Sequence, residues 1–405
     1  MEKSWWMHSK HTGGNSMCYF IGIDVAKYKH DFIILTDKGE IIQSPTTFSN
    51  NEAGFKELLD SLSKLDHSQE IKIGLESTGH YHKNLVKFLE DNNYQANILN
   101  AYLVHKFIEA RTLRKQKNDK LDCRWIAEYL QSVEFKTYQN KSYTSEQLKS
   151  LTRERDKLVL RRNQEYVDLT NALDLIFPEF KIIFDNRFSK TAIFLLNEYP
   201  SAKEISKIST KDLDKFKKKH KGTRLNKISS AIAQAKATIG HPNESISFII
   251  KTVTKLIIGL TEVIEDYEKQ ISKLLDKMNT PLLSIAGVGK ISAAAIIGEY
   301  NNFDGFPDAD KLLAFAGLEC SRYQSGESDY HGKMVKRGSP HLRYVLMNLA
   351  IALKNFNPLF HTYYLKKKEE GKPYRVALNH VVRKFLRVAF KLVSTNTKFD
   401  INLAK

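Results

Sequence analysis

Apolar residues in the first third of the chain come in short runs, a pattern that predicts strands separated by turns. Runs at 19–23, 32–35 and 41–42, with a turn between the last two, predict an antiparallel meander. The pattern then predicts a helix near 50–64, a strand at 71–75, a helix near 81–92, a strand at 96–99 and helical segments to about 133. Three neighbouring strands followed by alternating strands and helices predict a mixed α/β sheet.

The middle of the chain carries a seven-residue repeat of apolar side chains, which is typical of a coiled-coil seam. Its two rows are Ile250, Ile257, Ile264, Ile271 and Met278, and, offset by three, Val253, Leu260, Tyr267 and Leu274. An earlier helix at about 145–177 is the expected partner, although Arg155, Arg162 and Glu165 occupy its seam. The Lys-rich segment 180–240 between them has no clear period and predicts a small helical insertion.

Helical patterns broken by short glycine-containing segments continue from Pro281 and predict an all-α C-terminal domain. Residues 1–17 are polar and precede a strand abruptly, so we expect a tail outside the fold. The expected organisation is a tail at 1–17, an α/β domain at 18–140, a coiled-coil region with its insertion at 141–280, and a C-terminal domain at 281–405.

The net charge of the chain indicates a polyanionic partner. The 405 residues carry a net charge of +17, and residues 331–405 hold 16 lysines and arginines against 3 acidic residues. Clustered cations gain free energy by displacing counterions from phosphates, so we expect the C-terminal part to grip nucleic acid. Ribosome-bound and membrane-surface proteins share this signature.

Cysteine usage and hydropathy exclude several classes of protein. Cys18, Cys123 and Cys320 are far apart and odd in number, which argues against a disulfide framework and a structural zinc site and fits a reducing cytoplasm. No apolar run reaches the roughly 18 residues of a membrane span, and the first residues lack the apolar core of a signal peptide. We therefore expect a cytoplasmic protein without membrane segments.

Four acidic residues stand where carboxylates can gather. Asp24 and Glu76 each end a predicted strand, and Asp119 and Asp122 open a predicted helix on which positions three apart share a face. Taken singly, each residue also has an ordinary structural explanation. Asp24 can begin a turn, Glu76 can lie beside a helix cap, and the aspartate pair can interact with the helix dipole. Together they offer the hard oxygen ligands that suit Mg²⁺ or Mn²⁺. Two such ions activate an attacking oxygen and stabilise the leaving oxygen at a phosphodiester.

A second motif lies where Gly287, Val288 and Gly289 separate two apolar helical segments and precede Lys290. It resembles a helix-hairpin-helix, whose glycines let backbone amides approach a phosphate at a helix N-terminus and bind DNA regardless of its sequence. A tight helical turn explains the same residues equally well.

A serine with nearby cations forms the third motif. Ser325 lies in a polar, glycine-containing loop at 323–327 between apolar helices, and four basic residues follow: Lys333, Lys336, Arg337 and Arg343. A serine beside flexible backbone can attack a phosphate while cations stabilise the charge that develops. Most loop serines have no such role, so composition alone leaves both interpretations open.

Taken in order, these motifs resemble those of the DEDD transposase family of bacterial insertion sequences, which includes the pilin-gene invertases. The resemblance spans nearly the whole chain from Tyr19. It rests on Gly-Ile-Asp24-Val-Ala-Lys, Glu76-Ser-Thr-Gly, Lys-Asn-Asp119-Lys-Leu-Asp122, the Gly287-Val-Gly289 hairpin, Ala-Gly317-Leu, Gln-Ser325-Gly and Lys336-Arg-Gly-Ser.

The resemblance implies a RuvC-like N-terminal domain of the RNase H type, whose metal-binding acids are Asp24, Glu76, Asp119 and Asp122. It also implies a C-terminal transposase domain whose Ser325 attacks DNA and forms a covalent phosphoserine link. It further implies a homo-oligomer, a dimer or tetramer, in which the acids and the serine of different subunits complete one site. A structured guide RNA transcribed from the element is the implied second partner.

This chain departs from the family's pattern at three places. The family usually has threonine where Asn118 stands and alanine where Cys123 stands. Neither change removes a ligand. The insertion at 180–240 is also long, so RNA contacts are not carried over to the middle region.

We therefore expect a site-specific DNA recombinase of a bacterial insertion sequence, with Gly287, Gly289, Lys290 and the basic residues around Ser325 holding nucleic acid. Arginines 153, 155, 161 and 162 either contact RNA or form a solvated helix face. Two alternatives stay open. One is a junction-resolving nuclease in which metal-activated water cuts and Ser325 is incidental. The other is a non-catalytic nucleic-acid-binding protein whose acids are structural.

Overall fold

The computed structural model describes residues 17–76, 80–111, 119–133, 143–303, 305–325 and 328–402, with residues 119, 120, 143, 320, 322–325, 328–331 and 333 described by their backbone alone. The chain divides into two compact units, Met1–Asn140 and Lys141–Lys405. Each unit has its own hydrophobic core.

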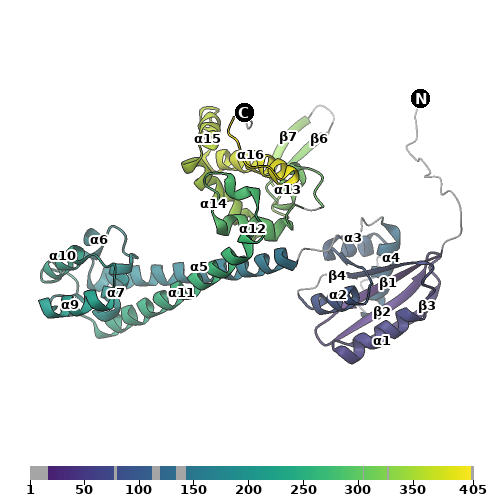
Figure 1. Ribbon diagram of the computed structural model, residues 1–405, viewed down its shortest axis with the longest axis horizontal. Helices are drawn as coiled ribbons and strands as arrows, with labels where there is room; N and C mark the ends of the chain where they lie inside the picture. The colour runs from purple at the N-terminus through teal and green to yellow at the C-terminus, as the bar shows by residue number, and fades with distance from the viewer. Residues whose placement is uncertain are drawn as a thin grey trace. The chain divides into compact units, whose positions relative to one another are not determined.

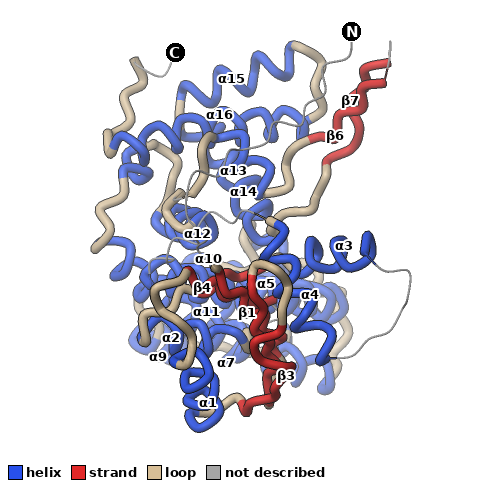
Figure 2. The backbone as a smooth tube through the Cα atoms, turned by 90° about the vertical axis from the view of Figure 1, so that its right-hand side faces the viewer, coloured by secondary structure: helices blue, strands red, loops and turns tan. Residues whose placement is uncertain are grey.

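The first unit is a sheet with helices on both faces (Figures 1 and 2). Its described elements are β1 (Cys18–Val25), β2 (Lys29–Thr36), β3 (Ile41–Ser49), α1 (Glu52–Ser63), β4 (Glu70–Glu76), α2 (His82–Asp91), β5 (Ala96–Leu99), α3 (Ala101–Arg111) and α4 (Asp119–Ser132). The strand order is β3-β2-β1-β4-β5, with β1, β2 and β3 antiparallel and β4 and β5 parallel to β1. The mixed α/β sheet predicted from the apolar pattern is confirmed.

Both faces of the central strand β1 are buried, because alternate side chains of a strand point to opposite faces. Ile21 and Ile23 pack with side chains of α1 and α2. Phe20 belongs to the core on the other face, together with Cys123 and Ile126 of α4. The strand is therefore apolar at almost every position, and Asp24 interrupts it just before the buried Val25 at its end.

The second unit is helical apart from one hairpin. Its described elements are α5 (Tyr143–Ile176), α6 (Phe180–Ile183), α7 (Lys190–Glu198), α8 (Ala202–Ile205), α9 (Thr210–Lys219), α10 (Leu225–Ala235), α11 (Glu244–Asp276), the 3₁₀ turn η1 (Pro281–Ser284), α12 (Lys290–Tyr300), α13 (Ala309–Phe315), β6 (Cys320–Ser325), β7 (Ser328–Met334), α14 (Pro340–Phe356), α15 (Pro358–Glu369) and α16 (Tyr374–Thr395).

The long helices α5 and α11 lie side by side and run antiparallel (Figure 1). Arg155 of α5 donates to Glu268 of α11, and Arg162, one heptad further along α5, donates to Thr261, one heptad back along α11. The predicted heptad isoleucines are at most 2% exposed: Ile250, Ile257, Ile264 and Ile271. The arginines in the α5 seam therefore have partners across the helix pair.

The segment predicted as a helical insertion contains α6 to α10 and lies at one end of the α5–α11 pair (Figure 1). These short helices share a core with the adjoining ends of α5 and α11. Phe177, Phe180, Leu195 and Phe216 are buried in it. The insertion is thus a folded part of the second unit and not a surface loop.

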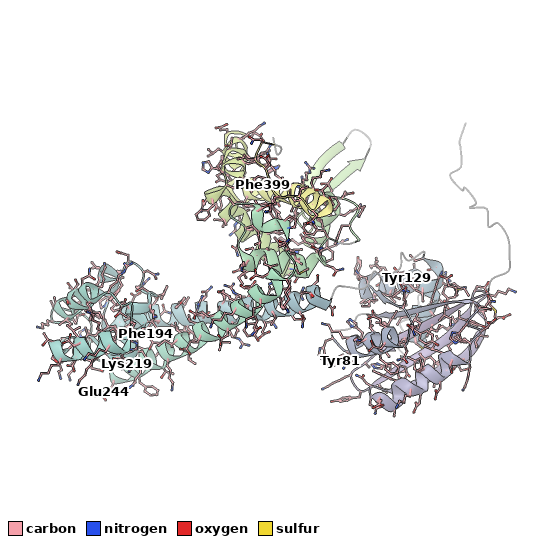
Figure 3. The ribbon with its side chains drawn as sticks, in the orientation of Figure 1. Tyr81, Tyr129, Phe194, Lys219, Glu244 and Phe399 are labelled. Carbon is pink, nitrogen blue, oxygen red and sulfur yellow. The ribbon has the colours of Figure 1, made fainter. Side chains whose placement is uncertain are left out.

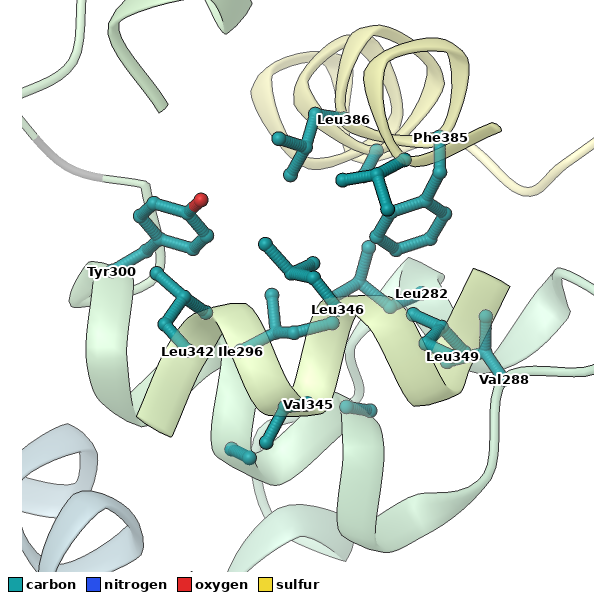
Figure 4. Packing of buried hydrophobic residues seen from close by; sticks show 14 of the residues in the cluster. Leu282, Val288, Ile296, Tyr300, Leu342, Val345, Leu346, Leu349, Phe385 and Leu386 are labelled. Carbon is teal, nitrogen blue, oxygen red and sulfur yellow. The ribbon is translucent and has the colours of Figure 1, made fainter. Parts of the chain in front are cut away.

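The C-terminal helices α12 to α16 share a core with the adjoining ends of α5 and α11, in which α12 is buried from Ala293 to Tyr300. Figure 4 shows Ile296 of α12, Leu346 of α14 and Phe385 of α16 within this core. A helix buried on all sides leaves no water for a charged side chain, so Glu299 of α12 needs partners from the protein.

The prediction of an all-α domain at 281–405 needs one correction. Cys320–Ser325 and Ser328–Met334 pair as the antiparallel strands β6 and β7, so the loop predicted at 323–327 begins inside a strand, and its residues 326 and 327 lie outside the described part of the chain. Both strands are polar, so the apolar alternation that reveals a half-buried strand is missing from the sequence. None of the described helices is both long and apolar enough to cross a membrane.

Candidate active site

Asp24 and Glu76 lie at the same end of two neighbouring strands. β1 and β4 pair in parallel with Ile23 beside Leu75 as the last pair, so Asp24 and Glu76 come next on each strand. Ile23 and Leu75 belong to the core formed with α1 and α2. Because side chains alternate, Asp24 and Glu76 belong to the opposite face, the one that α4 covers. Both residues are half-buried.

The helix α4 lies directly against β1 because Gly22 has no side chain. A Cβ at Gly22 would stand 2.1 Å from the carbonyl oxygen of Cys123 and 2.5 Å from the amide nitrogen of Ala127. Any other residue would push the helix away from the strand. Asp122, immediately before Cys123, is thereby held beside the strand that carries Asp24, and it is half-buried.

Electrostatics also place Asp24 near the start of α4. Burial, with a contribution from the carboxylates of Asp31 and Asp24, raises the pKa of the Cys123 thiol to about 12. A carboxylate raises the pKa of a thiol only when it is close, since it disfavours a second negative charge. The end of β1 and the start of α4 therefore form one acidic corner of the first unit.

Asp31 is a further carboxylate on this face and is not among the residues predicted from sequence. It pairs with Asp24 across β1 and β2, is 4% exposed, and accepts a hydrogen bond from the Thr47 hydroxyl. The predicted second strand began at Phe32, one residue too late to include it. Extending that strand back to Asp31 would have placed the two aspartates opposite each other across a short hairpin.

Of the four predicted acids, Asp24 and Glu76 lie at one end and on one face of the sheet, and Asp122 lies on the helix that covers this face. Asp119 is the first residue of α4, and its side chain lies outside the described part of the chain. Among the side chains that the structure describes, no three from His, Cys, Asp or Glu gather closely enough to hold a metal ion. The donors at this corner are carboxylate oxygens, which fits Mg²⁺ or Mn²⁺ better than a softer metal.

Ser325 is the last residue of β6 and pairs with Ser328 across the turn of the β6–β7 hairpin. Its side chain, like that of Lys333 on β7, lies outside the described residues. The hairpin extends from the C-terminal helices in Figure 2. The backbone position of Ser325 is set by the pairing of the two strands.

The two ends of this hairpin are held together where they join the helices. The Lys336 amide donates to the Gly317 carbonyl at 3.2 Å. Arg343 Nη1 donates to the carbonyls of Ala316 at 3.1 Å and Gly338 at 2.9 Å. Arg343, predicted to hold nucleic acid, thus also braces the base of the hairpin.

Two of the other predicted cations, Lys336 and Arg337, are exposed beside this base. Lys290 at the start of α12 is also half-exposed, and its Nζ lies 2.7 and 2.8 Å from the two carboxylate oxygens of Asp276. The two exposed residues are available to a phosphate as they stand. A phosphate at Lys290 would have to compete with the Asp276 carboxylate for the charge of the lysine.

Gly287 and Gly289 shape the turn before α12. Gly287 has a φ of +97°, which an L side chain adopts only with strain. Gly289 is the N-cap of α12 and brings no side chain to cap the first amides. The element before the turn is the 3₁₀ turn η1, so a single turn stands where the first apolar helical segment was expected.

A buried network of charges, not predicted from sequence, joins α5, α12 and α14. Arg153 donates to both carboxylate oxygens of Glu299, at 2.6 and 3.0 Å. His341 lies 3.1 Å from Glu299 through Nδ1 and 2.9 Å from Asp156 through Nε2. Ser339, the N-cap of α14, also donates to Glu299 at 3.2 Å.

This network shifts the pKa values of its members in the directions that stabilise charge. Burial alone would raise the pKa of Glu299, but the hydrogen bonds from His341 and Arg153 outweigh it and lower the pKa to about 2. Burial alone would lower the pKa of His341, but Asp156 and Glu299 raise it to about 9. At neutral pH the network therefore holds a charged histidine between two carboxylates.

Cations and tyrosines are interleaved on α14, α15 and α16. Lys354 Nζ lies 5.2 Å from the ring centre of Tyr364, and Lys384 Nζ lies 4.9 Å from that of Tyr363. Burial lowers the pKa of Lys384, and the nearby charge of Lys366 lowers it further. Like charges held this close make a surface suited to a polyanion.

Known proteins resemble the chain along most of its length. An uncharacterized 44.8 kDa protein of insertion element IS116 from Streptomyces clavuligerus is 23% identical over 94% of this chain and 96% of that protein. The pilin gene-inverting protein of Moraxella lacunata is 21% identical over 94% of this chain and 97% of that protein. Two protein-family models match the sequence. A family model of DEDD transposases, described as a transposase, matches residues 21–178, and a second family model, described as the IS116/IS110/IS902 transposase family, matches residues 279–365. The chain belongs to the IS110 family of DEDD transposases. The family resemblance predicted from sequence is confirmed.

Membership makes the chain an enzyme, a DNA transposase or recombinase. The range 21–178 contains the four acids, and the range 279–365 contains Ser325, the Gly287 turn and the predicted basic residues. The insertion at 180–240 lies between the two ranges, so its properties have to be argued from its own residues.

Proposed function

We propose that this transposase breaks and rejoins DNA at specific sites, with Asp24, Glu76, Asp119 and Asp122 as a divalent-metal site and Ser325 as the nucleophile. The observation that supports the proposal is the register of two neighbouring parallel strands, which brings Asp24 and Glu76 to the same end of the sheet, together with the close contact between β1 and α4, the helix that carries Asp122.

The topology of the sheet supports an RNase H-like, RuvC-like interpretation of residues 18–140. Three antiparallel strands are followed by two parallel strands in the order β3-β2-β1-β4-β5, and α4 crosses one face. The first acid is the next-to-last residue of the central strand, the second ends its parallel neighbour, and the last pair lies in the first turn of the helix. In this interpretation residues 141–280 are a coiled-coil region, and residues 281–405 are the transposase domain that carries the serine.

The carboxylates fit Mg²⁺ or Mn²⁺, since each contributes hard oxygen donors. Such an ion, when bound, supplies positive charge to the attacking and leaving oxygens of a phosphodiester. The protein's part is to fix the geometry of the ligands. Gly22 does this by letting α4 approach β1 closely enough for Asp122 to join Asp24.

In the proposed step the Ser325 hydroxyl gives up its proton as Oγ forms a bond to the phosphorus of a DNA strand. The bond between phosphorus and one strand oxygen breaks, and that oxygen leaves as a hydroxyl after taking up a proton. The number of phosphoester bonds is unchanged, so a strand hydroxyl can reverse the step and rejoin DNA without another energy source. Lys333, Lys336 and Arg337 would stabilise the charge that develops.

Nucleic-acid binding by the C-terminal part is supported by its backbone and by its charges. The uncapped start of α12 after Gly289 offers amides to a phosphate, as a helix-hairpin-helix does. Lys290, Arg343 and the lysines of α14 to α16 add positive charge around it. The partners we propose are the DNA of the element ends and target, a structured guide RNA and further copies of this chain in a dimer or tetramer.

Two substitutions separate this proposal from the two alternatives. The assay is Mg²⁺-dependent strand breakage and rejoining on DNA that carries the ends of the element. We expect Asp24→Asn to remove breakage and Ser325→Ala to remove breakage together with any protein–DNA link. The matched control, Asp91→Asn, removes an exposed carboxylate that forms an ion pair with Lys87 on the surface of α2, and should leave the activity unchanged.

The three interpretations give different results in this experiment. Breakage that continues in Ser325→Ala but needs Asp24 would identify a metal-dependent nuclease. Binding without Mg²⁺-dependent breakage in the unsubstituted chain would identify a non-catalytic nucleic-acid-binding protein. Either result would overturn the serine mechanism.

A further inference from the structure

The insertion at 180–240 is a second centre of positive charge. It holds 14 lysines and arginines against 5 aspartates and glutamates. Part of this charge is neutralised: Lys219 Nζ lies 2.5 Å and His220 Nε2 lies 2.8 Å from the same oxygen of Glu198, at the C-terminal end of α7. At the opposite end of α7 the described residues leave more of the positive charge uncompensated, because Lys190 has no ion pair there.

A hollow of about 370 Å³ opens at that opposite end, where α7 and α10 both begin. Ser189, Lys190 and Thr191 line it from the start of α7, and Arg224 and Lys227 line it from the start of α10. The Arg224 amide donates to the Thr191 hydroxyl at 3.0 Å, which ties the two helix starts together. The hollow is therefore built by fixed backbone and not by loose side chains.

The cations at this hollow are only partly compensated. Lys190 Nζ lies 5.7 Å from the ring centre of Phe194, the α7 residue labelled in Figure 3, and among the described residues neither Lys190 nor Arg224 has a carboxylate within ion-pair distance. Lys227 donates to the Ile183 carbonyl at 2.8 Å and lies 3.7 Å from Asp185. Asp185 is the single acidic residue in the lining.

The backbone around the hollow adds to the positive potential of these cations. Ser189 caps α7 by accepting from the Ala192 amide, but α10 begins at Arg224 without a side-chain cap. The first amides of a helix carry partial positive charge and point away from the helix body. Both helix starts face the place where the three cations meet.

We infer that this hollow binds a backbone phosphate of a nucleic acid, making the insertion a second nucleic-acid contact besides the C-terminal part. A polyanion fits better than a small free anion, because the insertion carries further exposed lysines outside the hollow, among them Lys217 and Lys218 of α9. The site uses the insertion's own residues and none of the carboxylates or Ser325. An experiment can therefore disprove this binding site without disproving the proposed reaction.

The test is a binding titration of the full chain against two probes, a duplex DNA and a structured RNA hairpin, each over a range of salt concentrations. The variant Lys190→Gln/Arg224→Gln removes the two uncompensated cations. We expect its affinity for one of the probes to fall roughly tenfold and the slope of log affinity against log salt to become shallower by roughly 1 to 2. The probe that loses affinity identifies the natural source of the phosphate.

The matched control is Lys203→Gln/Lys207→Gln, which removes the same charge from exposed positions of the insertion that do not line the hollow. Equal losses in the two double variants would show a diffuse electrostatic effect and overturn the site. Unchanged affinity of Lys190→Gln/Arg224→Gln for both probes would overturn it as well.

A second variant is expected to raise the affinity for the probe, which misfolding would not do. Asp185 is 91% exposed at its side chain, so Asp185→Asn removes the one negative charge of the lining without disturbing a core. We expect this variant to bind the same probe several-fold more tightly and with a steeper salt slope. Weaker or unchanged binding would contradict a phosphate in the hollow.

Discussion

His341 is held between two carboxylates in the second unit, and its environment makes the stability of that unit depend on pH. Asp156 and Glu299 are its acidic neighbours, and Arg153 and Arg155 compensate them from α5. Folding raises the pKa of His341 from 6.5 to about 9. Its contribution to stability is therefore complete below pH 6.5 and is lost as the pH rises through 9.

Glu299 sets the opposite, acidic limit. Its pKa falls from 4.5 to about 2 on folding, so its contribution is complete above pH 4.5 and is lost as the pH falls toward 2. The network should therefore stabilise the second unit most between these two limits, near pH 5 to 6.

We predict that His341→Gln removes the alkaline part of this pH dependence. The free energy of unfolding of the unsubstituted chain should fall between pH 6 and pH 9 by on the order of 2 kcal/mol more than that of the variant. Urea titrations at the two pH values measure it, with the exposed His361→Gln as the control. Equal pH dependence in His341→Gln and the unsubstituted chain would contradict the assigned role of the network.

At the scale of elements, the contact between α4 and β1 carries the candidate metal site. Gly22 is the point of closest approach, with no room for a Cβ against Cys123 and Ala127. Gly259 in the middle of α11 is the useful contrast, because a Cβ there would meet nothing within 4 Å. The same substitution at the two glycines should therefore have opposite effects.

We predict that Gly22→Ala lowers the free energy of unfolding by about 1 to 3 kcal/mol, because α4 has to move off the strand. Gly259→Ala should raise it by about 0.5 to 1 kcal/mol, because alanine favours the helix. Urea unfolding measures both. Gly22→Ala should also reduce Mg²⁺-dependent strand breakage, whereas Gly259→Ala should not. Full stability and activity in Gly22→Ala would contradict the described contact.

Elements with a strong apolar period could be predicted from the sequence, whereas those held by polar contacts could not. The strands of the first unit and the heptads of α11 are buried as expected. The seam of α5 looked weak because Arg155 and Arg162 interrupt it, yet both have partners on α11 that no pattern within α5 reveals. The β6–β7 hairpin was missed because its strands are polar.

The candidate site shows the same division between what the sequence reveals and what only the fold can reveal. Asp24 and Glu76 were identifiable because each interrupts an apolar run at a strand end. Asp31 was missed because its significance lies in its register opposite Asp24, which depends on the exact start of β2. Glu299 was missed because it lies in the otherwise apolar α12 and acts through residues on two other helices.

For the whole molecule, positive charge is concentrated in two places, residues 331–405 and the insertion at 180–240. Both lie in the second unit, and the candidate metal ligands lie in the first. This separation suits an enzyme in which one unit carries the metal-binding carboxylates and the other binds the nucleic acid. Carboxylates and phosphates repel each other unless a cation lies between them. Both units are needed for the proposed reaction.

The most direct test of the central claim is mass spectrometry of the protein after reaction with DNA that carries the ends of the element, in the presence of Mg²⁺. We predict a nucleotide joined through its phosphate to Ser325 in the unsubstituted chain, and no such adduct in Asp24→Asn. Strand breakage without any nucleotide on Ser325, or an adduct that forms equally well in Asp24→Asn, would contradict the account.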